Sequence, residues 1–152
     1  MRLFFGFTLG ALVIMSTVAG QPASKRGLVG NLKNHAADGC GCYFQFRGTP
    51  RKSEKYIFSS SIEDEKTAWM NIDGQDVELT LVKEKGPKTE RVGSRSSVRY
   101  RSRDITVSGT YVATRVCKPN DENCESTAYS ATFVVGKGAK SQVVKAVGSC
   151  GC

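Results

Sequence analysis

The six cysteines are the residues of this chain whose type and spacing could do chemistry most directly. They come in three groups, Cys40-Gly-Cys42, Cys117 with Cys124, and Cys150-Gly-Cys152. An even set of six thiols in an oxidising compartment predicts three disulfides. The alternative is that the two Cys-Gly-Cys units converge as four thiolates and hold zinc or copper.

The positions of the cysteines favour particular disulfide pairs. Cys117 and Cys124 flank a turn-rich loop, so a hairpin would bring their Cα atoms to the separation of about 5.5 Å that a disulfide needs. The two Cys-Gly-Cys units begin and end the predicted domain, and residues i and i+2 of a strand face the same side. Neighbouring antiparallel end strands would pair Cys40 with Cys152 and Cys42 with Cys150, whereas parallel strands would give the other register.

Groups suited to acid–base catalysis are few. The single histidine, His35, precedes the first cysteine, and the sequence contains no nucleophile-elbow, phosphate-binding or dinucleotide-binding pattern. Two sets of carboxylates could support a hydrolase if they converged across a cleft, namely Glu63, Asp64 and Glu65, and Asp73 with Asp76. The sequence favours a non-enzymatic protein without cofactor or metal, with the thiolate metal site and the carboxylate-based hydrolase as alternatives.

Positive charge is concentrated in one segment. The chain has 22 Lys and Arg against 14 Asp and Glu. The segment from Lys83 to Arg103 contains eight basic residues and two acidic ones, Glu84 and Glu90. In a strand, alternate side chains project from one face about 6.5 to 7 Å apart, and Tyr100 would lie on the opposite face. The predicted anion-binding residues are Arg95, Arg99, Arg101 and Arg103.

Such a basic row suits an acidic polysaccharide or an acidic protein surface. Nucleic acid is not favoured as a partner, because no motif with interleaved aromatic residues is present. The alternative interpretation is a solvated edge strand whose charges prevent edge-to-edge aggregation.

The N-terminal segment predicts export. Arg2 is followed by an apolar stretch that ends in small residues, so residues 1–20 resemble a secretory signal peptide. After cleavage we expect a secreted or periplasmic product with no stable membrane insertion. Residues 21–38 are polar with few apolar anchors and predict a flexible leader, which leaves residues 39–152 as one β domain of ordinary size.

The elements that must position these groups read as short strands. Aromatic and β-branched runs bounded by turn residues predict strands at residues 42–47, 55–59, 68–72, 77–81, 98–103, 105–116, 127–135 and 142–147. Asp73-Gly74 is a hairpin turn dipeptide, followed by Val77, Leu79 and Leu81 at core-facing alternate positions. About eight strands and no long helix predict an all-β fold, a small antiparallel sandwich or barrel stapled by disulfides.

Overall fold

The computed structural model describes residues 27–35, 39–50, 52–64, 66–87, 91–118, 121 and 123–152. In this part the chain forms the strands β1 (Val29–Gly30), β2 (Gly41–Phe46), β3 (Phe58–Ser61), β4 (Thr67–Ile72), β5 (Gln75–Lys85), β6 (Arg95–Ser102), β7 (Ile105–Arg115), β8 (Ser126–Lys137) and β9 (Lys140–Gly151). No helix in these residues is long and apolar enough to cross a membrane. The predicted signal peptide, residues 1–20, lies outside the described residues.

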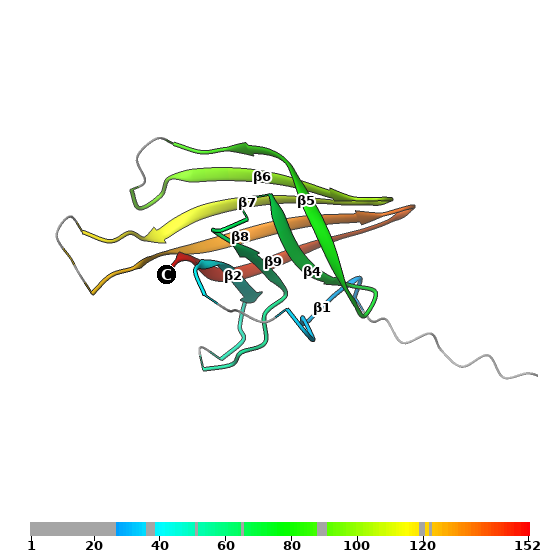
Figure 1. Cartoon of the computed structure of the whole chain (residues 1–152), viewed down its shortest axis with the longest axis horizontal. Helices are drawn as coiled ribbons and strands as arrows, with labels where there is room; N and C mark the ends of the chain where they lie inside the picture. Colours follow the sequence, from blue (N-terminus) through cyan, green and yellow to red (C-terminus); the bar gives the residue numbers. More distant parts are fainter. Residues whose placement is uncertain are drawn as a thin grey trace, which may run out of the picture.

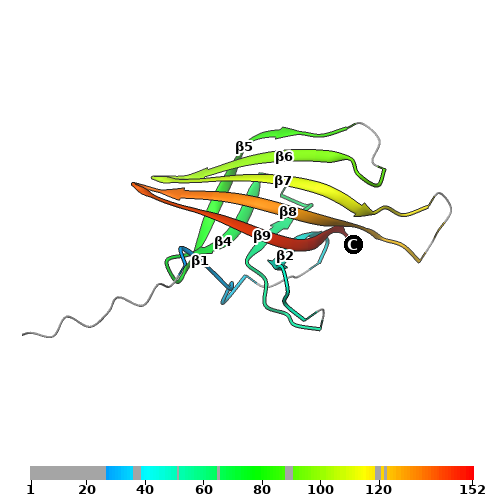
Figure 2. The ribbon, with the colours of Figure 1, turned by 180° about the vertical axis from the view of Figure 1, so that it is seen from behind.

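Eight of the strands close into an antiparallel barrel. Each strand from β2 to β9 pairs with the next one along the chain, and β9 pairs back with β2. The long strands β5 to β9 form a curved sheet, and the shorter β2, β3 and β4 complete the barrel beside it (Figures 1 and 2). The predicted all-β fold is confirmed, and of the two predicted forms the molecule adopts the barrel.

Tight turns make this up-and-down order possible. At the tip of the β4–β5 hairpin, Asp73 and Gly74 both have positive φ, 51° and 81°, as the two central residues of a type I′ turn require. The predicted hairpin is therefore confirmed. The remaining strand, β1, extends the sheet on the edge of β4, with Val29 opposite Ile72.

Side chains fill the interior of the barrel. Three fully buried phenylalanines, Phe44, Phe58 and Phe133, meet there with ring centroids 5.1–5.9 Å apart, in the edge-to-face and offset geometries that aromatic rings prefer. From the predicted hairpin, Leu79 is fully buried, and Val77 and Leu81 pack against the core. Because alternate residues of each strand face inward and outward, most groups that meet ligands must lie on the outer face.

The two Cys-Gly-Cys units close the barrel covalently. Cys42 is the register partner of Cys150 and is bonded to it, with Cα atoms 4.0 Å apart, and Cys40 is bonded to Cys152 at 4.2 Å. The antiparallel alternative is thus the one that the structure adopts. Cys117–Cys124 forms the third disulfide, as predicted. No cysteine is free, and the four cysteines of the two Cys-Gly-Cys units are bonded as disulfides in this structure rather than held as thiolates.

The glycine inside each Cys-Gly-Cys unit lets the strands approach closely. A Cβ at Gly41 would collide with the carbonyl oxygen of Ser60, and one at Gly151 with the carbonyl oxygen of Glu125. Gly151 also has a φ of 146°, which side-chain-bearing residues rarely adopt. Both units therefore need glycine at the centre to lie flat against a neighbouring strand.

The two bonds between β2 and β9 should stabilise the barrel redundantly, because they close loops of 112 and 108 residues that nearly coincide. Closing one such loop lowers the free energy of the folded state, relative to the unfolded state, by about 5 kcal/mol in the chain-entropy model, and the second bond adds little. We expect Cys40→Ala/Cys152→Ala to lower the free energy of unfolding by only about 1–2 kcal/mol. The quadruple alanine variant should lose about 5 kcal/mol or fail to fold. Urea unfolding would measure this, and equal additive losses from the two pairs would contradict it.

Tyr111 carries an unpaired polar group in the core. Its ring packs on Phe44 and Phe133, and its hydroxyl has no hydrogen-bond partner among the described groups. Burial, reinforced by nearby Tyr100 and Glu84, raises the pKa of Tyr111 well above 10. Because an unsatisfied buried hydroxyl costs about 1–3 kcal/mol, Tyr111→Phe should raise the free energy of unfolding by about 1 kcal/mol. Tyr111→Leu, which also removes the ring, should lower it, and urea titrations of both variants provide the check.

Candidate functional site

Part of the predicted leader packs on the barrel. Residues 27–35 run along β4 and β5, with Leu28 and Val29 buried. Asp76 Oδ2 accepts hydrogen bonds from the backbone amides of Lys33 and Asn34, both at 2.8 Å. These residues of the predicted leader are docked on the barrel by backbone pairing with β4, by two buried apolar side chains and by the Asp76 carboxylate.

The docked segment brings the single histidine to the outer face of the barrel. The His35 ring stacks on Trp69 of β4, with centroids 3.5 Å apart and planes within 7°, and Ser59 Oγ donates to the His35 carbonyl at 3.0 Å. Beside this stack lies a hollow of about 390 Å³, which we call the upper hollow. It is lined by Asn34, His35, Tyr43, Ser59, Ser60, Ser61, Asp64, Thr67 and Trp69.

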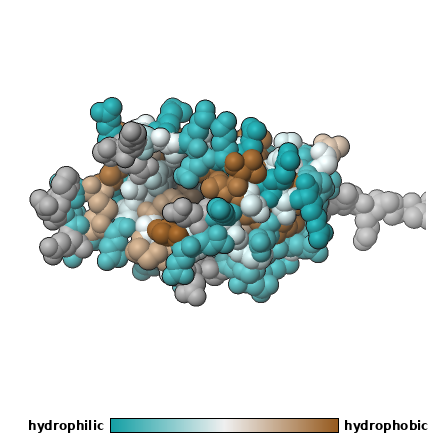
Figure 3. Space-filling model, turned by 45° about the horizontal axis from the view of Figure 1, so that its top comes forward, coloured by the Kyte–Doolittle hydropathy of each residue, from teal (hydrophilic) through white to brown (hydrophobic). Residues whose placement is uncertain are grey.

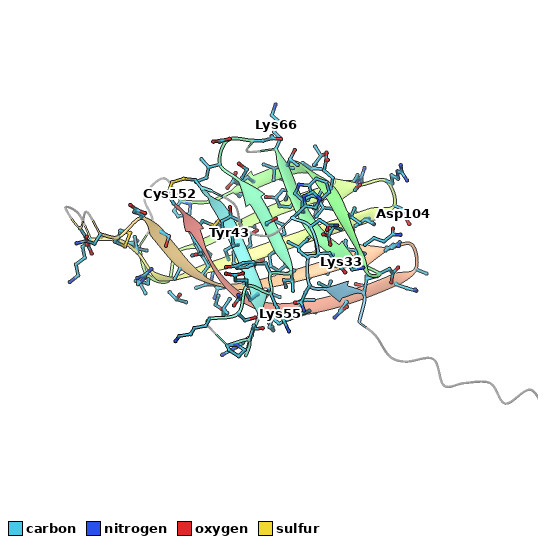
Figure 4. The ribbon with its side chains drawn as sticks, turned by 60° about the horizontal axis from the view of Figure 1, so that its bottom comes forward. Lys33, Tyr43, Lys55, Lys66, Asp104 and Cys152 are labelled. Atoms are coloured by element: carbon cyan, nitrogen blue, oxygen red, sulfur yellow. A yellow bond between two sulfur atoms is a disulfide. The ribbon has the colours of Figure 1, made fainter. Side chains whose placement is uncertain are left out.

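A larger groove of about 850 Å³ opens on the other side of Tyr43. It is bounded by the β2–β3 loop on one side and by the outer faces of β7, β8 and β9 on the other. The Tyr43 and Tyr56 rings meet there at 5.7 Å, and Figure 4 shows Tyr43 between Cys152 and Lys55 of that loop. The groove is lined by Tyr43, Gln45, Thr49, Tyr56, Thr114, Arg115, Ala128, Tyr129, Ser130, Val147, Gly148 and Ser149.

Two side chains of β2 hold the wall of this groove in place through hydrogen bonds to backbone carbonyls. Gln45 is almost fully buried, and its Nε2 donates to the carbonyl oxygen of Ser53 in the β2–β3 loop. Tyr43 Oη donates to the carbonyl oxygen of Gly39 at 3.0 Å. The two side chains therefore fix the loop and the start of β2 relative to the sheet.

Three of the four predicted anion-binding residues lie on the outer face of β6. Arg95, Arg99 and Arg101 are exposed and alternate with the buried Val98 and Tyr100. Arg103 lies one residue beyond the end of β6, in the β6–β7 turn, with a positive φ of 48°. We call the exposed cations of the two strands the basic strip: Lys83, Lys85, Arg95, Arg99 and Arg101.

The basic strip is electrostatically unbalanced. Lys83 is the direct register partner of Arg99 across the β5–β6 pair, and like charges in opposite positions of an antiparallel pair destabilise it. The salt bridge found in the described part of the chain joins Lys137 and Asp73 and lies elsewhere. In Figure 3, which brings this side of the molecule forward, hydrophilic side chains stand along the upper edge.

The candidate hydrolase carboxylates do not converge. Glu63 and Asp64 belong to the β3–β4 turn, and Asp73 and Asp76 to the β4–β5 hairpin, so the length of β4, about 17 Å, separates the two sets. Asp73 binds Lys137 at 2.9 Å, and that hydrogen bond lowers the pKa of its carboxyl. Glu65 lies outside the described residues. Among the residues that the structure describes, no three His, Cys, Asp or Glu side chains are grouped to hold a metal ion.

Comparison with protein-family models, with curated proteins and with solved structures finds no match for this chain.

Asp76 should anchor the docked segment in a pH-dependent way. Burial opposes its ionisation, but hydrogen bonds from Asn34, Asn71 and Lys33 outweigh burial and lower its pKa below 3.8. A lowered folded-state pKa contributes stability above the unfolded-state value of about 3.9, and this contribution is lost as the pH falls through the folded-state pKa.

We therefore expect Asp76→Asn to lower the melting temperature above pH 5 and to have a shrinking effect below pH 4. Amide hydrogen exchange at Lys33 and Asn34 should become faster in the same variant, because both amides donate to the replaced oxygen. A melting-temperature difference that stays constant from pH 7 to pH 3 would contradict the assignment.

Proposed function

We propose that this protein is an exported, non-enzymatic β-barrel that binds an acidic polysaccharide of the cell envelope or the extracellular space through its basic strip. The observation that carries the proposal is the direct opposition of Lys83 and Arg99 in a strip of exposed cations that has no salt bridge in the described residues. Such an arrangement costs stability in the free protein. A bound polyanion would relieve the repulsion. Solubility alone does not require two cations in directly opposite positions, so the arrangement favours a binding role.

The spacing of the strip suits a chain of anions. Lys83 and Lys85 on β5, and Arg99 and Arg101 on β6, are each about 6.5–7 Å apart along their strand, and the two strands are about 4.8 Å apart. Arg99 and Arg101 present planar guanidinium groups, which can hold carboxylates or sulfates through paired hydrogen bonds. A linear acidic polysaccharide can therefore meet several cations at once, whereas a small anion meets one or two.

The three disulfides are consistent with an oxidising compartment. Together with the signal-like residues 1–20 they support secretion or a periplasmic location, where acidic polysaccharides occur and nucleic acid is scarce. Arg103, in the turn at the end of β6, extends the strip toward the β4–β5 hairpin end of the barrel.

The proposal predicts weaker binding when the strip is neutralised. We expect Arg95→Gln/Arg99→Gln/Arg101→Gln to elute from heparin at clearly lower salt and to bind about tenfold more weakly near 0.15 M salt, because each exposed ionic contact contributes about 0.2–1 kcal/mol. The matched control is Lys52→Gln/Lys118→Gln/Lys140→Gln, which removes three exposed charges outside the strip. Equal retention losses in the two variants would show that net charge alone binds heparin and would overturn the proposal. Binding of an acidic protein but of no acidic polysaccharide would also overturn it.

A further inference from the structure

Strand register places a row of side chains around the outside of the barrel. Trp69 pairs with Ser59, Ser59 with Tyr43, and Tyr43 with Ser149. Ser149 in turn pairs with Ala128, and Ala128 with Arg115. We call this row the belt: Trp69, Ser59, Tyr43, Ser149, Ala128 and Arg115. It crosses six strands and spans about 24 Å.

The belt is concave on both sides of its centre. The Tyr43 side chain lines both the upper hollow, which holds Trp69, and the groove, which holds Arg115. The two depressions therefore adjoin at one residue and follow one direction across the strands. Their volumes, about 390 and 850 Å³, lie within the range of sites that bind drug-sized ligands.

The lining combines aromatic rings with short polar groups. Tyr43 and Tyr56 offer rings in the groove, and the His35–Trp69 stack borders the upper hollow. Ser59 and Ser60 line the upper hollow, and Thr114, Ser130 and Ser149 line the groove. Rings that pack against the apolar faces of a ligand, with hydroxyls that bond its edges, are the chemistry that recognises sugar rings.

Charge gives the belt a direction. Arg115 stands in the groove, and Asp64 lines the upper hollow. A hydrogen bond from the Thr67 side chain and another from the Lys66 amide lower the pKa of Asp64, so its carboxyl is charged at neutral pH. A ligand carboxylate is therefore favoured near Arg115, and sugar hydroxyls that can donate are favoured near Asp64.

The Arg115 end of the belt leads toward the basic strip. The backbone of residues 93 and 94 bonds to Ala113, two residues before Arg115, through Gly93 N to Ala113 O and Ala113 N to Ser94 O. Arg95 begins β6 directly after this contact. A polymer that leaves the groove past Arg115 would thus meet the strip, whereas the other end of the belt is bordered by the docked residues 34 and 35.

We propose that the belt is a glycan-binding cleft for a linear polysaccharide in which uronic acids alternate with neutral sugars. A uronic carboxylate binds Arg115, neutral sugar rings pack on Tyr43 and Tyr56, and the chain continues onto the basic strip. The proposal rests on the proposed function, since it names the class of acidic polysaccharide and seats its sugar rings. An acidic peptide fits less well, because the lining is rich in hydroxyls and aromatic rings and its one Lys or Arg side chain is Arg115.

The experiment uses the only tryptophan of the chain, Trp69, as a reporter inside the belt. We expect hyaluronan hexasaccharide, an alternating glycan, to change Trp69 fluorescence saturably, and chitin hexasaccharide, its uncharged counterpart, to bind at least tenfold more weakly. Tyr56→Ala and Arg115→Gln should each weaken hyaluronan binding at least fivefold. The matched controls are Val134→Ala and Lys140→Gln, which change exposed residues outside both the belt and the basic strip and should alter hexasaccharide binding less than twofold.

Tyr43→Ala is a further belt variant, and since Tyr43 also bonds Gly39, its melting temperature must first match that of the parent protein. No fluorescence change with either hexasaccharide, equal binding of both, or unchanged binding in Tyr56→Ala and Arg115→Gln would overturn the belt proposal. Heparin retention of the strip variants is measured in parallel. If heparin retention depends on the strip but neither hexasaccharide binds, the belt proposal is wrong and the proposed function stands. If hyaluronan hexasaccharide binds but retention does not depend on the strip, the proposed function is wrong and the belt remains a glycan-binding site.

Discussion

The pairing of β2 with β9 is the constraint on which the rest of the molecule depends. Without it, β2 to β9 would be an open meander with two exposed edges; with it, they become a closed barrel whose interior is sealed by aromatic side chains. Two disulfides fix this seam at one end of the barrel, and the seam also joins the two halves of the belt, because Tyr43 and Ser149 face each other across it. The same β2–β9 pairing therefore closes the core and makes the outer surface continuous.

Alternation within each strand ties the outer surface to the core. Tyr43 stands between Cys42 and Phe44, and Arg99 between Val98 and Tyr100, so each outward group is flanked by inward neighbours. The backbone beneath such side chains is held on both sides, so it loses little further freedom when they bind a ligand. The surface groups gain rigidity from packing that they do not themselves take part in.

The fold could be predicted from the sequence to a large extent. Eight alternating runs, the Asp73-Gly74 turn and the cysteine positions are local signals, and they were enough for the strand count, the hairpin and the possible disulfide pairs. Three features needed information that is not local. The choice between sandwich and barrel depends on whether β4 pairs with β5 while β2 pairs with β9. The docking of residues 27–35 depends on Asp76, more than forty residues away. The groove depends on register across β7, β8 and β9, which brings Arg115 opposite Ala128 through an irregularity in the ladder, and no pattern within one strand announces it.

The crowded glycines of the β2–β9 seam limit how the sequence of a homologue can differ there. Gly148 is crowded in the same way as Gly41 and Gly151, since a Cβ there would collide with the backbone of β2. The hydrophobic interior can exchange one apolar residue for another at modest cost, so over long divergence the core is free to drift. The β2–β9 seam cannot change in this way, because no other residue can replace its disulfide-bonded cysteines or fit in the space of its glycines. The seam has a simple sequence pattern, a Cys-Gly-Cys unit followed about 108 residues later by Gly-x-Cys-Gly-Cys. We expect this pattern to identify distant homologues better than the core residues do.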